Sequence, residues 1–353
     1  MAIKAHNMAL NFKKETFRED YTYSNSDAAI KRFPFPFPED QYMYSVNIEP
    51  HTKGKQGTVC EFTFDIDEHY VAECLDKKIT LEQDPGRYKA LPHMMDAQWD
   101  FVELTMEALA QDYPEHFSLK KQGLIWTWEN KPLGIKDTFT FGDTSTLATE
   151  PFDYIGRQLQ GDFVLLDHRD ETLYADAGIV TSQADWSLAF NVGMSWREWH
   201  GPVPRATELG VMDRALKYLL NLQIGSPVRR LNWTMTVNPR LDTSPENYPH
   251  WGGERNTVNA ENIGDLIHLR VELQTLFRLP RSNAIVFSIR CYLISLKDIA
   301  TYPRWAKRLH RVQKTMHPDL IEYKGMTKFH PMMVDWLAKF DDGETLAIGT
   351  QPE

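Results

Sequence analysis

The stretch HLRVELQ (residues 268–274) alternates strictly between polar and apolar side chains. Successive side chains of a β-strand point to opposite faces, so this alternation predicts a strand with one polar and one apolar face. The polar face carries His268, Arg270, Glu272 and Gln274. The apolar run continues to Leu276, and we expect the strand to cover about residues 266–276.

The segments on both sides of this strand have the same character. VRRLNWTMTV (residues 228–237) sets Arg230, Asn232, Thr234 and Thr236 against apolar neighbours, and residues 284–296 are rich in β-formers. Three such strands in succession predict an antiparallel meander. Two polar faces on neighbouring strands could form one wall of a pocket, or they could simply face water, as one side of an antiparallel sheet often does.

Further out, DFVLLDHRDETLYAD (residues 162–176) reads as a β-hairpin, and apolar residues recur at helical spacing in residues 96–109 and 206–222. A strand-like stretch covers residues 57–64, and the apolar residues around Trp305 and at 332–337 predict two C-terminal helices. The order of hairpin, helical middle and meander predicts an α+β fold with a PAS-like antiparallel sheet. We expect an N-terminal extension and C-terminal helices to pack around this sheet.

This order divides the chain into three regions. We expect an arm and cap in residues 1–150, the PAS-like core in residues 151–300, and a helical tail in residues 301–353. Within the first region, RFPFPFP (residues 32–38) alternates proline with phenylalanine. Proline favours extended backbone, so the run predicts an extended arm, which we place on the surface of the rest.

Composition limits the possible partners and compartment. The 353 residues carry a net charge of -10, which opposes binding to polyanions such as DNA and RNA. The three cysteines are widely spaced and form no Cys-x-x-Cys motif, which is typical of reduced cytosolic proteins without a zinc or iron–sulfur site. Residues 1–19 do not resemble a secretion signal, and no run is apolar enough for a membrane span. We therefore expect a cytoplasmic protein that binds neither nucleic acid nor membrane.

His200 is the strongest candidate for a metal ligand. It lies in WHGPVP (residues 199–204), where an aromatic neighbour and two prolines could hold the imidazole in one orientation. A structural, hydrogen-bonded histidine is the alternative. No second histidine or carboxylate stands at His-x-Asp/Glu spacing to it, so the segment does not predict a two-histidine, one-carboxylate iron site. A haem iron needs only one protein ligand, together with an apolar pocket and a polar group on the open side, a role that Arg230 could fill.

Four stretches resemble one known family. They are LQGDFVLL (159–166), GMSWREWHGPVP (193–204), PVRRLNW (227–233), and HLRVELQTLFRLPRS (268–282) continued by FSIRCY (287–292). Together they are similar to the haem subunit of the haem-dependent oxidative N-demethylases, also described as dimethylamine monooxygenases. The likeness extends over about residues 75–300.

The resemblance implies a haem b monooxygenase that converts dimethylamine and O2 to methylamine and formaldehyde. NADPH would supply the electrons through FMN and 2Fe-2S centres on partner reductase subunits, and a folate-binding subunit could belong to the same complex. It implies His200 as the axial iron ligand, with His268 as its rival, and Arg230 on the oxygen side. Because dimethylamine is a cation at neutral pH, a buried site must provide an anion for it, and we expect Glu272 in this role. The remaining residues expected at the cofactor are Arg270, Trp233 and Tyr292.

Two other functions stay open at this point. A haem-PAS sensor of gas or redox state would share the sheet and the histidine, although no kinase, cyclase or DNA-binding output segment is visible in the sequence. A non-catalytic binding subunit of an oxidoreductase complex would need no haem. The colour of the purified protein separates the haem-free function from the other two.

Overall fold

The computed structural model describes residues 23–43, 46–51, 63–203 and 209–352. Its centre is the predicted meander of three long strands: β8 (Val228–Val237), β9 (Ile267–Arg278) and β10 (Ile285–Ser295). All three pair antiparallel in sequence order, as alternation predicts. The bounds expected from the sequence are correct to within two residues.

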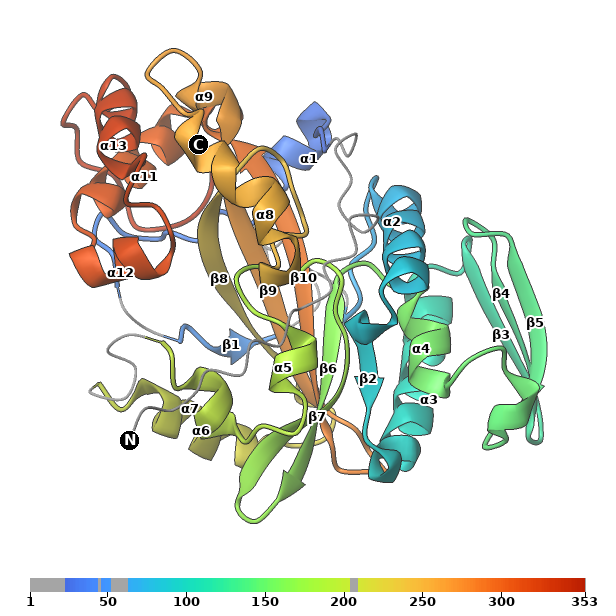
Figure 1. Cartoon of the computed structure of the whole chain (residues 1–353). Coiled ribbons are helices and arrows are strands. Elements are labelled where there is room, and N and C mark those ends of the chain that lie inside the picture. The colour runs from blue at the N-terminus through green and yellow to red at the C-terminus, as the bar shows by residue number, and fades with distance from the viewer. Residues whose placement is uncertain (1–22, 44–45, 52–62, 204–208, 353) are drawn as a thin grey trace.

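The predicted hairpin extends this meander. Strands β6 (Asp162–Arg169) and β7 (Thr172–Ile179) are joined at Asp170 and Glu171, both with positive φ, as a tight two-residue turn requires. Strand β6 pairs with β10, and the short strands β1 (Glu49–Pro50) and β2 (Tyr88–Ala90) complete the sheet. The order is β1-β8-β9-β10-β6-β7-β2, antiparallel throughout (Figure 1).

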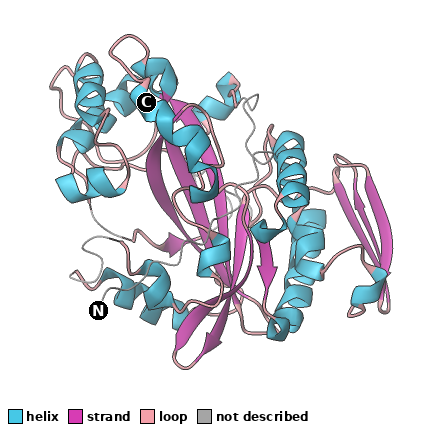
Figure 2. Ribbon diagram, viewed as in Figure 1, coloured by secondary structure: helices cyan, strands magenta, loops and turns pink. Residues whose placement is uncertain are grey.

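Helices cover both faces of this sheet (Figure 2). One face packs its apolar residues against helices from the C-terminal region, and its core includes Trp233, Val271, Tyr292 and Trp305. These helices are α9 (Ile263–Leu266), α10 (Leu296–Ile299), α11 (Pro303–Lys314), α12 (Pro318–Tyr323) and α13 (His330–Ala338). The two C-terminal helices expected from the sequence correspond to α11 and α13, and α12 lies between them.

The other face lies beneath the irregular middle of the chain. Helix α7 (Val211–Leu220) packs Leu216 and Leu219 against Val228 and Leu276 of the sheet. The shorter helices of this region are α5 (Leu188–Asn191), α6 (Trp196–His200) and α8 (Tyr248–Trp251). Part of the predicted helix at residues 206–222 lies outside the described residues.

The first region of the chain forms a third core. Helix α3 (Met95–Asp112), which matches the predicted helix, packs with α2 (Tyr70–Gln83) and α4 (Pro151–Gly156). A separate three-stranded sheet, β3 (Phe117–Gln122), β4 (Ile125–Asn130) and β5 (Ile135–Thr140), was not predicted and projects at one side of the molecule (Figure 1). The strand expected at residues 57–64 lies almost entirely outside the described residues.

The proline-rich arm follows the short helix α1 (Asp27–Lys31) and is extended, as predicted, but its placement on the surface was wrong. Phe33, Phe35 and Phe37 are buried in the core with Trp305 and Trp233, and the ring of Phe35 stacks on Trp305 at 5.1 Å. Three phenylalanines on one side of an extended segment carry too much apolar surface to leave in water.

The structure confirms the α+β class, with antiparallel sheets and helices at both ends of the chain. The likeness to PAS domains and the three-region division stay predictions. No helix in the described ranges is long and apolar enough to cross a membrane.

Candidate functional site

The predicted polar faces of β8 and β9 meet in register. Arg230 lies directly opposite Gln274, and Asn232 lies opposite Glu272. Together with Arg270 these residues form one continuous row, which we call the polar row. The polar row is not a solvated face of the sheet, because Arg270, Glu272 and Gln274 are all buried. A buried row of charged and amide groups must satisfy its own hydrogen bonds, and it does.

Glu272 is the centre of the polar row. Its Oε2 accepts hydrogen bonds from Asn232 Nδ2 at 3.2 Å and from Gln274 Nε2 at 3.0 Å. Its Oε1 faces Arg270 Nε at 3.4 Å. Two amides and a guanidinium therefore hold a carboxylate in one orientation inside the protein.

Arg270 is fixed by the protein on every side. Besides the contact with Glu272, its NH1 donates to the carbonyl oxygens of Leu241, at 2.5 Å, and Arg240, at 3.5 Å. Its NH2 donates to the carbonyl of Ser182 and to Cys291 Sγ. All five guanidinium N–H groups are thus in use. The expected contact of Arg270 with the cofactor stays a prediction, and this geometry makes it a positioning residue for Glu272.

Arg230 begins the polar row. Its Nε donates to the carbonyl oxygen of Val46 at 2.7 Å, and its NH1 donates to Gln274 Oε1 at 2.7 Å. Gln274 in turn donates to Glu272, so Arg230 and Glu272 are linked through one side chain. The sequence placed these two residues on one wall, and the structure brings them together.

His200 is the last residue of helix α6, whose start at Ser195 is closed by a capping box with Glu198. The Gly-Pro segment ends the helix directly after it, as proline chemistry predicts. His200 Nδ1 contacts the carbonyl oxygen of Trp196 at 2.9 Å, and a carbonyl can only accept a hydrogen bond. The proton is therefore on Nδ1, which leaves Nε2 with its lone pair and, among the described residues, without a hydrogen-bond partner.

The surroundings of His200 keep it neutral. Burial lowers the pKa of its imidazole to about 4, and the positive charge of Arg230 lowers it further. The rings of Trp196 and Trp199 lie 4.1 and 5.2 Å from the imidazole, and Trp199 also contacts Phe287 and Trp186. A neutral imidazole with its second nitrogen held by a carbonyl, in an aromatic setting, has the usual features of a metal ligand.

Three other predicted residues lie elsewhere. Trp233 and Tyr292 project from the opposite face of the sheet into the core that the C-terminal helices cover. Their contact with the cofactor stays a prediction. His268 is buried on β9, with Nδ1 3.0 Å from the carbonyl oxygen of Leu266, and burial lowers its pKa. It lies beyond Arg270 on the strand, so its position as rival ligand also stays open.

Sequence reasoning missed two charged residues near Glu272. Lys324, directly after α12, and Asp185, before α5, both interact electrostatically with Glu272. Burial raises the pKa of Asp185, yet 46% of its side chain is accessible. Asp185 also lines a small cavity with Thr234, Thr243 and Trp251. No strand periodicity marks either residue, because both lie outside the strands.

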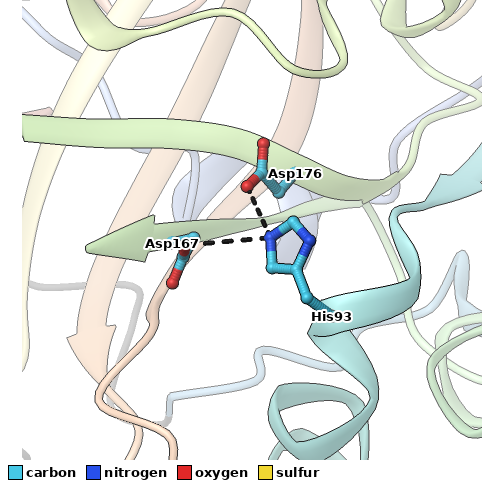
Figure 3. A group of neighbouring side chains, drawn as sticks. All are labelled: His93, Asp167 and Asp176. Carbon is cyan, nitrogen blue, oxygen red and sulfur yellow. Dashed lines mark hydrogen bonds and ion pairs between the residues drawn. The ribbon is translucent and has the colours of Figure 1, made fainter. Parts of the chain in front are cut away.

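A histidine and two carboxylates form a separate cluster on the hairpin side of the molecule. His93 Nε2 lies 2.8 Å from Asp176 Oδ2 and 3.8 Å from Asp167 Oδ2 (Figure 3). These are metal-ligand types within 4.8 Å of one another. Arg169 NH1, however, contacts both carboxylates, so the protein's own cation already compensates their charge. The cluster is therefore best described as an ion-pair network.

A cavity of about 760 Å³ lies elsewhere, at the beginning of β8. It is lined by exposed parts of α7, including Arg214, Lys217 and Tyr218, and contains none of the polar row. We take the polar row as the candidate functional site because it gathers buried charged groups and because the charge of Arg230 acts on His200, whereas the 760 Å³ cavity is an open groove.

Fold and site define an α+β protein whose sheet carries a buried, fully hydrogen-bonded acidic site beside a neutral histidine with an available nitrogen. The model of one protein family, described as haem-dependent oxidative N-demethylase, alpha subunit-like, matches residues 54–334. The match covers more than half of the chain, and the chain belongs to this family, whose description places it among haem-dependent oxidoreductases.

Proposed function

We propose that this chain is the catalytic subunit of a cytoplasmic enzyme that oxidatively demethylates a small secondary amine, with dimethylamine as the substrate. One turnover would convert dimethylamine, O2, NADPH and a proton to methylamine, formaldehyde, NADP⁺ and water. The observation that carries the proposal is the buried carboxylate of Glu272, held by Asn232, Gln274 and Arg270 on the same side of the sheet as the neutral His200.

His200 suits the role of the residue that would hold the iron of a haem b. Its Nδ1–H is held by the carbonyl of Trp196, so Nε2 can bind iron without first losing a proton. The aromatic rings of Trp196, Trp199 and Phe287 supply flat apolar surface near the imidazole. When bound, the haem would supply the activation of dioxygen.

Glu272 suits the recognition of an amine cation. A dialkylamine is protonated at neutral pH, and burying its charge is costly unless an anion receives it. The two amides that hold Glu272 are neutral and orient the carboxylate, and Arg270 Nε, 3.4 Å from Oε1, is the cation that faces it. Arg230, linked to Glu272 through Gln274, is a fixed positive charge at the other end of the row, and a charge of this sign would stabilise negative charge on oxygen.

The electron supply would come from other chains. The family description names an alpha subunit, which supports a multi-subunit assembly. We propose that reductase subunits with FMN and a 2Fe-2S centre transfer electrons from NADPH, and that a folate-binding subunit could accept the formaldehyde. The few cysteines of this chain agree with a cluster located on a partner.

Two variants test the proposal. The purified protein should show a strong haem absorption band, and His200→Ala should abolish or reshape it. Glu272→Gln should keep the haem and lose both the spectral change on amine addition and turnover. A colourless wild-type protein would point to a non-catalytic binding subunit. A haem protein that binds gas but shows no amine-dependent change would point to a sensor.

A further inference from the structure

We propose that Asp162 is a positioning residue that keeps the Arg270 guanidinium from pairing fully with Glu272. It does so by fixing the backbone of Ser182, whose carbonyl oxygen holds one end of the guanidinium. The inference rests on the proposed function, because it takes an amine cation as the ligand of Glu272. It gives a role to the LQGDFVLL stretch (159–166), which contributes no residue to the polar row.

Asp162 is the first residue of β6, and its carboxylate binds the backbone that follows β7. Oδ1 accepts hydrogen bonds from the N–H groups of Thr181 at 2.8 Å and Ser182 at 3.2 Å, and Oδ2 accepts from the Ser182 N–H at 2.9 Å. The side chain is buried, and the charges of Lys77 and Arg270 favour its ionised form. A buried carboxylate with such bonds fixes the groups that donate to it.

A second segment, residues 240–243, also holds Arg270 and pairs with the first segment. The carbonyl oxygen of Leu241 accepts from Arg270 NH1 at 2.5 Å. The N–H of Thr243 donates to the carbonyl oxygen of Gln183 at 2.9 Å. This pairing begins one residue beyond the backbone that the buried carboxylate holds. The two contacts together therefore fix the carbonyl that faces Arg270 in the first segment.

The two segments turn the ends of the Arg270 guanidinium away from Glu272. NH1 donates to Leu241, and NH2 donates to the carbonyl of Ser182 and to Cys291 Sγ. Only Nε faces the carboxylate, 3.4 Å from Glu272 Oε1. A charge-assisted N–H···O bond is usually about 2.7–2.9 Å long, and arginine often pairs with a carboxylate through two such bonds. The long single contact therefore leaves Glu272 able to bind a second cation.

Removal of the Asp162 charge should release this arrangement. Both carboxylate oxygens accept from the Ser182 N–H, so Asp162→Asn would place an amide NH2 against that N–H in either orientation. The backbone at Ser182 would have to move, and Arg270 NH2 would lose its carbonyl acceptor. Glu272 is the carboxylate already in contact with this guanidinium, so NH2 would turn toward it. An amine cation would then have to displace the guanidinium from Glu272.

Spectral titration of the haem-loaded protein with dimethylammonium chloride tests the role of Asp162. Asp162→Asn should raise the dissociation constant about tenfold, because the amine must replace a charge-assisted hydrogen bond. In the assembled complex the KM for the amine should rise by a similar factor, while kcat at saturating amine should stay within about twofold of wild type. The haem absorption band should not change. A lower kcat with an unchanged KM would contradict the positioning role.

Asp162→Ala and Asp100→Ala form a matched pair that separates positioning from stability. Asp100 is also 1% exposed, and its Oδ2 accepts from the N–H groups of Arg281 at 2.9 Å and Ser282 at 2.8 Å in the turn between β9 and β10. Each variant removes a buried carboxylate that holds two consecutive N–H groups, so both should lose stability. Only Asp162→Ala should bind the amine more weakly. Equal amine affinity in the two variants would overturn the proposal.

A structural experiment decides even if the Asp162 variants do not fold. In crystals of the wild type with and without dimethylammonium chloride, Arg270 should keep its bonds to the carbonyls of Ser182 and Leu241. A guanidinium that leaves Ser182 in either crystal would overturn the inference. Absence of haem, or of any amine-dependent spectral change in wild type, would overturn the proposed function and this inference with it. Wild-type amine affinity in Asp162→Asn would overturn this inference alone.

Discussion

Arg270 is the residue on which the polar row depends most. Its side chain is fully buried, and its five N–H groups donate to Glu272, three carbonyls and Cys291. Arg270→Met would leave these acceptors unpaired and Glu272 without its closest cation. We expect a loss of roughly 3–5 kcal/mol in the free energy of unfolding, measured by urea denaturation. Arg197→Met, at an exposed arginine paired with Asp213, should change it by less than about 1 kcal/mol.

A double variant separates charge from packing. Arg270→Met with Glu272→Met removes both charges, and it should recover part of the lost stability because no charge is left unpaired. A double variant as unstable as the sum of the single ones would show that the two side chains act independently.

The neutral imidazole of His200 makes stability depend on pH. Its pKa is lowered to about 4 in the folded state, against about 6.5 in the unfolded chain. Below pH 6.5 the unfolded state binds a proton that the folded state does not bind until about pH 4. The free energy of unfolding should therefore fall as the pH falls through this window, by up to about 3 kcal/mol. The measurement is urea denaturation of haem-free protein at pH 7 and pH 4.5, for wild type and His200→Gln. Equal pH dependence in the two proteins would contradict the assignment.

At the scale of single residues, the alternation of polar and apolar side chains predicted which residues share a face of the sheet. The period of two placed Arg230 and Glu272 on neighbouring polar faces, and the structure shows in addition that Gln274 links them. It could not predict Lys324 or Asp185, because a helix cap and a loop residue reach the site only through the tertiary fold. Alternation also places Trp233 on the face opposite Arg230 and Asn232, and there its side chain lies in the core that the C-terminal helices cover.

At the scale of elements, the end of α12 is the most specific local structure near the site. Gly325 has φ +64°, and a Cβ there would lie 2.6 Å from the guanidinium of Arg255. Gly325→Ala should therefore cost about 1 kcal/mol for the strained backbone and more for the displacement of Arg255, which pairs with Asp185. Gly123→Ala is a matched control, with φ +61° and open space around it. Thermal or urea denaturation should show a larger loss of stability for Gly325→Ala than for Gly123→Ala. Equal losses would show that the side chain of Arg255 can move away from the new Cβ without a cost in stability.

The strands that were predicted and those that were missed differ in the length of their alternating pattern. The long strands of the meander could be predicted because each carries at least ten residues of signal. The sheet of β3, β4 and β5 has six-residue strands. Its signal was present: Trp126 and Trp128 are buried and Thr127 between them is not, with Gly123 and Gly134 at the turns. Such short runs are also compatible with irregular structure, which is why the region was expected only as a cap.

At the scale of the whole molecule, the N-terminal arm and the C-terminal tail meet on α11. Arg308 donates to the carbonyl of Pro38 and to that of Ala347, and Trp305 Nε1 donates to Thr350 O at 2.9 Å. Gly349 N in turn donates to Pro38 O at 2.9 Å. Sequence patterns could not predict this arrangement, since it joins segments about 300 residues apart that have no periodicity in common. Residues of the arm and of the tail therefore both lie beside α11, against the core that carries Trp233.

Phe35 is the side chain that holds this closure together. It is buried, lies 5.1 Å from Trp305 with nearly parallel rings, and contacts Phe37, which packs on Trp233. Phe35→Ala should lower the free energy of unfolding by about 3–5 kcal/mol, and limited proteolysis should cut the arm first because its local contacts are lost before the sheet opens. Phe35→Leu keeps most of the volume and should lose much less. Phe190→Ala, at a ring that is 72% exposed, should change neither readout. If Phe35→Ala left stability and the cleavage pattern unchanged, the arm would be an appendage on the fold, and α11 alone would have to close the core behind Trp233.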